Sequence, residues 1–245
     1  MYSARKPGLS VITSFGWGGV FLSDTFSKAE QEVVYRVIRA RRDIRHFSGR
    51  PVPERVLLRI LQAAHHAPSV GFMQPWNFIL VHSKEIREQI KSSFEEMNAD
   101  QLKQISETDR KELYSRLKLE GIMEAPVNLA VTCDRNRDAP FVLGRGPMPE
   151  TDLFSTCLAI QNMWLAARVE GVGVGWVSIL NRERVEEILG LPPGIRLVAY
   201  LCIGYPVEFR EKPMLEELGW KSRMDLKSLI YENQWGQELK SFHLD

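Results

Sequence analysis

The sequence predicts one α+β domain in which helices outnumber strands. Segments with apolar residues at helical spacing alternate irregularly with short runs of β-branched and aromatic residues, which indicates neither a helix bundle nor a sandwich. The chain has 245 residues, 44% of them hydrophobic, which is enough for one sizeable core. We find no internal repeat and no low-complexity segment, so we expect one main domain, residues 26–204.

The helices are predicted from their start signals and their spacing. A capping box at Ser27 and Glu30 opens the first helix, and Pro53 lies in the first turn of the second. Thr151 is expected to cap the longest helix, whose apolar residues lie on more than one side. The stretch 100–120 is charged with a sparse apolar stripe, typical of a surface helix or a lid. The expected helices are 27–41, 53–67, 83–94, 100–120, 151–171 and 181–190.

Short buried runs bounded by turn residues predict the strands 78–81, 127–133, 172–179 and 197–203. After Gly204 the chain is rich in Pro, Trp and charge and shows little periodicity. We therefore expect residues 205–245 to form a tail that wraps a partner subunit.

Composition narrows the function classes. The formal net charge of +1 gives no bulk electrostatic field that would attract nucleic acid or an anionic membrane. We also expect no metal site. The three cysteines show neither zinc-ligand nor disulfide spacing, which fits a cytoplasmic protein. Residues 1–25 resemble a weak signal peptide, but polar residues and glycines dilute the apolar run, so a flexible extension is expected.

An arginine cluster stands out at the end of the first predicted helix. Arg41, Arg42 and Arg45 surround one carboxylate, Asp43, within five residues. Guanidinium groups offer planar forks of donors that match phosphate oxygens. The alternative is a solvated, self-neutralising helix end, with Asp43 as an ion-pair partner of Arg45.

Other segments favour a ligand at this cluster. The loop 68–77 contains prolines, a glycine and small polar residues together with the apolar residues Phe72, Met73 and Trp76. Loops that combine turn residues with apolar side chains often contact ligands. Basic residues near 221–223 suggest a second anchor for one phosphate. The glycines of 171–175 close a helix and open a strand, the reverse of a dinucleotide-binding fingerprint. The basic residues suggest a bound phosphate and the aromatic residues suggest a flat ring. A ligand with both, in a chain without a dinucleotide-binding fingerprint, indicates FMN.

The chain also resembles a known family along residues 26–235. The pattern of the arginine cluster, with Ala67-Pro68-Ser69, Gln74-Pro75-Trp76-Asn77-Phe78 and the glycines before Trp176, is similar to the nitroreductase-like flavoproteins. Within them it resembles the 5,6-dimethylbenzimidazole synthases, which take part in cobalamin biosynthesis. The segments closest to that branch are 67–78, 118–122, 131–135, 142–145 and 171–179.

The resemblance implies a fold and a set of site residues. The fold would be a central mixed, mainly antiparallel sheet flanked by helices, in a domain-swapped homodimer with the flavin at the interface. Asp43 replaces the serine of ordinary nitroreductases, and with Ser178 it would be catalytic. The implied cofactor-binding residues are Arg41, Arg42, Arg45, Ser69, Gly71, Gln74, Trp76, Asn77, Leu119, Trp176, Lys221 and Arg223.

The resemblance further implies an oxidoreductase that uses O2 to fragment reduced FMN into 5,6-dimethylbenzimidazole and erythrose 4-phosphate. A separate flavin reductase would supply the reduced FMN. Two alternatives stay open. One is a conventional FMN-dependent NAD(P)H nitroreductase or dehalogenase, in which the flavin cycles, and the other is a flavin-storage protein.

Overall fold

The computed structural model describes residues 25–240, which fall into two compact units, one ending at Arg36 and one beginning at Val37. The first unit contributes the start of helix α1, Lys28–Ala40. Its predicted capping box is confirmed, because the Ser27 N–H donates to Glu30 Oε2 at 2.8 Å and the Glu30 N–H donates to Ser27 Oγ at 3.3 Å. The expected extension, apart from Thr25, lies outside the described residues.

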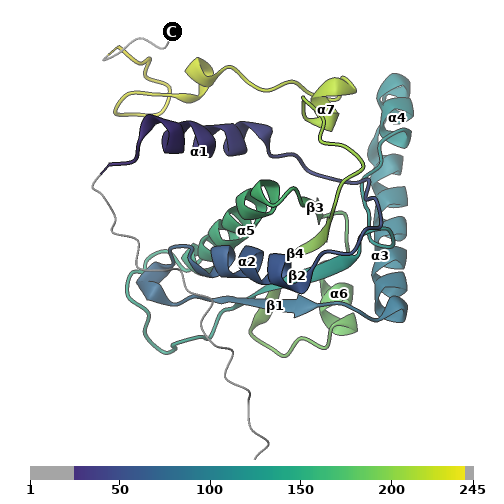
Figure 1. The fold of residues 1–245 in the computed structure, drawn as a ribbon, viewed down its shortest axis with the longest axis horizontal. Coiled ribbons are helices and arrows are strands. Elements are labelled where there is room, and N and C mark those ends of the chain that lie inside the picture. The colour runs from purple at the N-terminus through teal and green to yellow at the C-terminus, as the bar shows by residue number, and fades with distance from the viewer. Residues whose placement is uncertain (1–24, 241–245) are drawn as a thin grey trace, which may run out of the picture. The chain divides into compact units, whose positions relative to one another are not determined.

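The second unit is built on a four-stranded sheet with the order β1-β2-β4-β3 (Figure 1). All three strand pairings are antiparallel, so the expectation of a mixed sheet is corrected within the described residues. Parallel pairing is limited there to a single bridge between Asp43 and Val174. The strands are β1 Trp76–Leu80, β2 Val127–Asp134, β3 Gly173–Val177 and β4 Ile195–Gly204.

Helices cover both faces of this sheet. Successive side chains of a strand point to opposite faces, and on β4 Leu201 joins one core cluster whereas Tyr200 joins the other. Helices α2, Glu54–His65, and α5, Thr151–Val169, cover the first face. Helices α3, Lys84–Gln104, and α6, Arg182–Ile188, cover the second face. The α+β prediction is therefore confirmed.

Several predicted boundaries change. Strand β1 begins at Trp76, two residues earlier than expected, so part of the presumed ligand loop is strand. The lid region forms the end of α3 and a short α4, Thr108–Ser115, and α3 is the longest helix, with 21 residues against 19 in α5. Thr151 does not cap α5, because its hydroxyl donates to the Met148 carbonyl.

The chain after β4 has few regular elements, as predicted. It holds only short helices, α7 at Met214–Glu217 and the 3₁₀ turn η2 at Leu226–Leu229, within its described part. Its start lies beside the arginine cluster, because Phe47 and Pro206 form an antiparallel bridge. None of the helices in residues 25–240 is long and apolar enough to cross a membrane.

Candidate active site

Asp43 lies at the point where the chain leaves α1 and runs beside strand β3. Its Oδ1 accepts the Trp176 N–H at 3.0 Å, and its Oδ2 forms an ion pair with Arg45 Nη2 at 2.5 Å. The same Nη2 donates to the Trp176 carbonyl at 2.7 Å. The backbone of one residue therefore holds both the acid and the arginine, while 42% of the Asp43 side chain stays accessible.

Glycine makes this close approach possible. A Cβ on Gly175 would lie 2.0 Å from the Ile44 carbonyl oxygen and 2.7 Å from Arg45 Nη1. Any larger residue would push the Asp43 segment away from β3. The glycines that exclude a dinucleotide fingerprint thus have a different purpose, since they let the arginine cluster dock on the sheet.

Helix α5 supports the other two arginines through Trp164, a residue that no motif singled out. The Arg41 guanidinium carbon lies 4.9 Å from the Trp164 ring centroid, and Trp164 Nε1 donates to the Arg42 carbonyl at 3.1 Å. Such a cation–π contact holds a guanidinium without using its donors. A tryptophan at helical spacing in an apolar helix indicates only core packing, so sequence reasoning does not identify this role of Trp164.

The cluster opens into a recess of about 230 Å³. One wall is formed by residues 42–46 and the other by the chain after β4. Typical ligand pockets hold about 300–1,000 Å³, so this recess accommodates only part of a nucleotide-sized ligand. Two basic residues that sequence analysis missed, Arg210 and Lys212, also line it.

The arginines present donors that have no acceptor. Arg42 Nε, Arg45 Nε and Arg45 Nη1 are buried without a hydrogen-bond partner in the described chain. Burial lowers the pKa of Arg41, opposed by Asp43 and reinforced by the positive charges of Arg42 and Arg223. Arg223 therefore lies within electrostatic reach of the cluster. Unpaired guanidinium donors of this kind fit the phosphate and carbonyl oxygens of FMN.

Desolvation raises the pKa of Asp43. The Arg45 ion pair, the Trp176 N–H and Arg41 act in the opposite direction but do not outweigh it. A carboxylate with a raised pKa and an accessible edge is a suitable general base.

The loop before β1 forms a second, separate set of predicted site residues. Ser69 Oγ accepts the Gln74 N–H at 3.0 Å, which closes the loop. Gly71, Phe72 and Gln74 all have positive φ angles, of 53°, 55° and 49°. Two of these are not glycine, and such strained conformations cluster at ligand sites.

This loop does not reach the Asp43 recess within the described chain. Gln74 and Trp76 line a different recess, together with His65 and Arg137. Trp76 is buried and donates from Nε1 to His65 Nδ1 at 3.2 Å, so it belongs to the core. Asn77 accepts from Arg137 Nη2 at 2.5 Å. The structure thus divides the predicted residues between two places.

The remaining predicted residues lie closer to the arginine cluster. Leu119 packs in the same core cluster as Ile44 and Phe47. Ser178 is exposed directly after β3, two residues beyond the Trp176 that binds Asp43. Lys221 is exposed two residues before Arg223.

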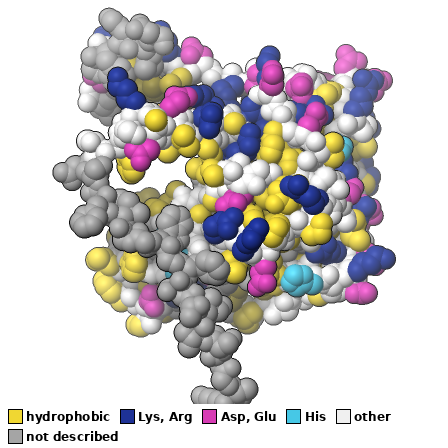
Figure 2. Space-filling model, in the orientation of Figure 1, with side chains coloured by type: hydrophobic (Ala, Val, Ile, Leu, Met, Phe, Trp, Pro, Cys, Tyr) yellow, Lys and Arg dark blue, Asp and Glu magenta, His cyan; other side chains and the backbone are white. Residues whose placement is uncertain are grey.

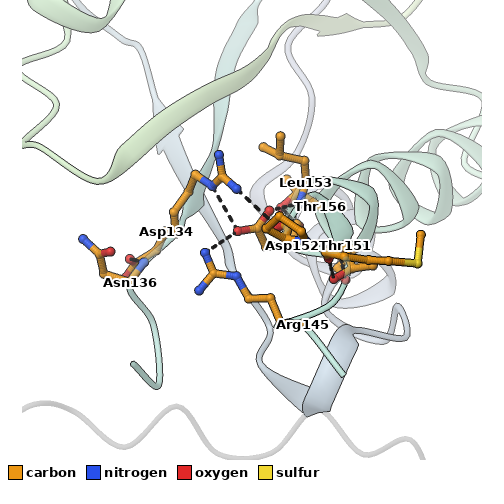
Figure 3. Close-up of polar contacts among 11 residues, drawn as sticks. Asp134, Asn136, Arg145, Thr151, Asp152, Leu153 and Thr156 are labelled. Atoms are coloured by element: carbon orange, nitrogen blue, oxygen red, sulfur yellow. Dashed lines mark hydrogen bonds and ion pairs between the residues drawn. The ribbon is translucent and has the colours of Figure 1, made fainter. Parts of the chain in front are cut away.

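A second carboxylate–arginine cluster fixes the surroundings of the loop (Figure 3). Asp152, fully buried in the first turn of α5, binds Arg145 Nη2 at 2.9 Å and Arg135 Nε at 3.1 Å through Oδ2. The segment that carries Arg145 packs on Gly71, where a Cβ would lie 2.8 Å from the Leu143 carbonyl oxygen. Asp152 follows directly after the start of a predicted helix, and no sequence pattern links it to Arg135 or Arg145.

Comparison with known proteins identifies this arrangement. Residues 38–205 match the Nitroreductase family. The chain belongs to the nitroreductase family. Within the family, the chain is 46% identical to a 5,6-dimethylbenzimidazole synthase of Rhodospirillum rubrum, over 75% of this chain and 86% of that protein. It is 39% identical to one of Rhodobacter capsulatus, over 81% of this chain and 96% of that protein.

These identities place the chain on the 5,6-dimethylbenzimidazole synthase branch of the nitroreductase family, a flavin-binding family. The resemblance noted in the sequence is thereby confirmed. Among solved structures, iodotyrosine deiodinase bound to FMN and 3-iodo-L-tyrosine has a TM-score of 0.64 at 22% identity, covering 82% of this chain and 98% of that one. This likeness confirms the nitroreductase-like fold.

Proposed function

We propose that this enzyme makes 5,6-dimethylbenzimidazole by oxygen-dependent fragmentation of reduced FMN, with erythrose 4-phosphate as the second product. The observation that carries the proposal is Asp43, a carboxylate of raised pKa in a recess that is also lined by Arg42 and Arg45, whose guanidinium groups carry buried donors without an acceptor. The bound flavin supplies the electrons that react with O2 and the ring that becomes the product.

The residues of the chain divide the work by their chemistry. Arg41, Arg42 and Arg45 bind the phosphate and orient the ribityl chain, at about 1.5–3 kcal/mol for each charge-assisted hydrogen bond. Asp43 accepts a proton from the ribityl or ring side at its accessible carboxylate edge. Ser178 donates its hydroxyl hydrogen to the N5/O4 edge of the ring.

We also propose that two copies of the chain complete each site in a domain-swapped homodimer. The Asp43 recess is small and the 69–74 loop faces elsewhere, so one chain holds two incomplete halves. Helix α5 is apolar on its outer side, where Phe154 is 54% exposed and Leu158, one turn later, is 46% exposed. In the tail Trp235 is 88% exposed. Figure 2 shows hydrophobic side chains exposed among basic ones on one face.

The test of the reaction is aerobic incubation with chemically reduced FMN, followed by chromatography. We expect loss of flavin absorbance to match the appearance of 5,6-dimethylbenzimidazole, and a Ser178→Gly variant should bind flavin but form little product. Sustained NADPH oxidation with constant flavin absorbance would instead indicate a conventional nitroreductase. Stable binding of reduced FMN in air would indicate a storage protein.

A mixing experiment tests the shared site. Chains with Asp43→Asn and chains with a disabled loop, such as Gly71→Val, are each expected to be inactive alone. If each site takes Asp43 from one chain and the loop from the other, mixed dimers contain one intact site and recover product. No recovery in mixed dimers would contradict sharing.

A separate flavin reductase is the proposed source of reduced FMN, and adding one should replace the chemical reductant.

A further inference from the structure

Trp220 connects helix α4 to the basic end of the tail. The guanidinium carbon of Arg110 on α4 lies 4.3 Å from the Trp220 ring centroid. The Tyr114 ring, also on α4, lies 6.1 Å away at an interplanar angle of 56°. Trp220 therefore makes a cation–π contact with Arg110 and an aromatic contact with Tyr114.

The α4 side of this contact is rigid. Tyr114 is only 8% exposed, and its hydroxyl donates to Asn98 Oδ1 on α3 at 2.7 Å. The backbone N–H of Trp220 donates to the Leu215 carbonyl at 2.8 Å, which ties the main chain at residue 220 to the turn that ends α7. The otherwise irregular tail is therefore anchored at residue 220.

This anchor lies directly before two cations. Lys221 and Arg223 are exposed and form no ion pair among the described residues. The charge of Arg223 makes the smallest of the contributions to the lowered pKa of Arg41, after burial, Asp43 and Arg42. Holding like charges close together costs free energy unless an anion joins them. The anchor at Trp220 opposes the separation of these cations.

We propose that Trp220 is a positioning residue that holds Lys221 and Arg223 at the phosphate end of the site, so that α4 sets the preference for phosphorylated over unphosphorylated flavin. The proposal rests on the proposed function, because it takes the FMN phosphate as the anion. Trp220 itself acts through Arg223 and does not touch the ligand.

The test measures the dissociation constants of oxidised FMN and of riboflavin by flavin fluorescence. Trp220→Ala should weaken FMN binding about 10-fold, the worth of one charge-assisted hydrogen bond, and leave riboflavin within about 2-fold. Trp220→Phe keeps a ring and should restore most of the FMN preference. Arg110→Ala should act in the same direction, whereas Arg116→Ala, whose side chain pairs with Glu112, serves as its matched control.

A double variant separates this inference from the proposed function. If Trp220 acts through Arg223, Trp220→Ala adds little to the loss of FMN preference caused by Arg223→Ala. If Arg223→Ala changes the preference but Trp220→Ala, Arg110→Ala and Trp220→Phe do not, the positioning role is overturned and the phosphate role stands. If Arg223→Ala leaves the preference unchanged, the phosphate assignment itself is wrong. Equal weakening of both ligands by Trp220→Ala would show a merely structural role.

Discussion

The part of the chain that the structure describes contains two clusters in which arginines surround an aspartate, and they differ in how many hydrogen bonds and ion pairs the aspartate makes. Asp152 is fully buried, two arginines share its Oδ2, and its Oδ1 accepts the Leu153 N–H at 2.6 Å. Asp43 has one partner on each oxygen and remains 42% accessible. Arg145 also has an unpaired Nε, but three such donors gather around Asp43 on Arg42 and Arg45.

The difference teaches how to distinguish a structural charge cluster from one that binds a ligand. A saturated acid in a dry environment stabilises one arrangement of the chain. An acid with an open edge, beside cations that lack acceptors, leaves its interactions to be completed by something else. The following substitutions test that distinction.

The largest effect is expected from Asp43→Asn. The amide keeps the contact with the Trp176 N–H but cannot act as a base, so product formation should fall about 10²–10⁴-fold. The free energy of unfolding should change by only about 1 kcal/mol, because the group is partly exposed. Chromatographic product assays and urea titrations measure the two quantities. Product formation at the original rate would exclude Asp43 as the base.

Asp152→Asn should show the opposite pattern. Removing this carboxylate leaves Arg135 and Arg145 without their counter-charge, and breaking a buried ion pair costs about 3–5 kcal/mol of the free energy of unfolding. Urea denaturation measures it, with Asp100→Asn as the matched control, since that aspartate forms an exposed pair with Lys103. A loss below that of the control would show that the cluster is not structural.

Gly71→Ala tests whether the Asp152 cluster supports the 69–74 loop. The new methyl group would lie 2.8 Å from the Leu143 carbonyl oxygen at a positive φ, so we expect a loss of about 1–3 kcal/mol in unfolding free energy. Gly49→Ala has a similar φ, of +74°, but open space around it, and should cost less. Equal losses would mean that the packing between the two segments is loose.

The smallest effect concerns the pH dependence of stability. Because burial raises the folded-state pKa of Asp43 above 3.8, the folded chain retains that proton to higher pH than the unfolded chain. Stability from this group is therefore present below that range and is lost as the pH rises through the raised pKa. As the pH rises through this range, the free energy of unfolding of the native chain should fall relative to that of the Asp43→Asn variant. The opposite slope in urea titrations would show that the Arg45 ion pair dominates.

Strand alternation and helix spacing are local, and they predicted the α+β class, whereas the sheet flanked by helices was implied by the family resemblance. The sequence also identified Arg41, Arg42, Asp43 and Arg45 from their proximity in the chain. The ion pairs of Asp152 were not predicted, because its partners Arg135 and Arg145 precede it across an irregular segment without periodicity. Trp164 was missed because a tryptophan on an apolar helix looks the same whether it packs in a core or supports a cation.

The separation of the predicted site residues between two recesses was not predicted from the residue patterns. Gln74 and Trp76 line one recess, whereas Arg42, Asp43 and Arg45 line the other. Such patterns are local, and only the family resemblance implied a site at an interface between subunits.

The main chain of residue 176, rather than its indole, binds both Asp43 and Arg45. Every residue except proline, which has no N–H to donate, can make these main-chain contacts at position 176, although a change of side chain also alters the packing of the indole on Trp164 and the core. The shape of the surface next to the acid then becomes adjustable while the acid itself stays where it is. Saturation mutagenesis at this position would be a practical starting point for altering which ring-bearing compounds the enzyme accepts.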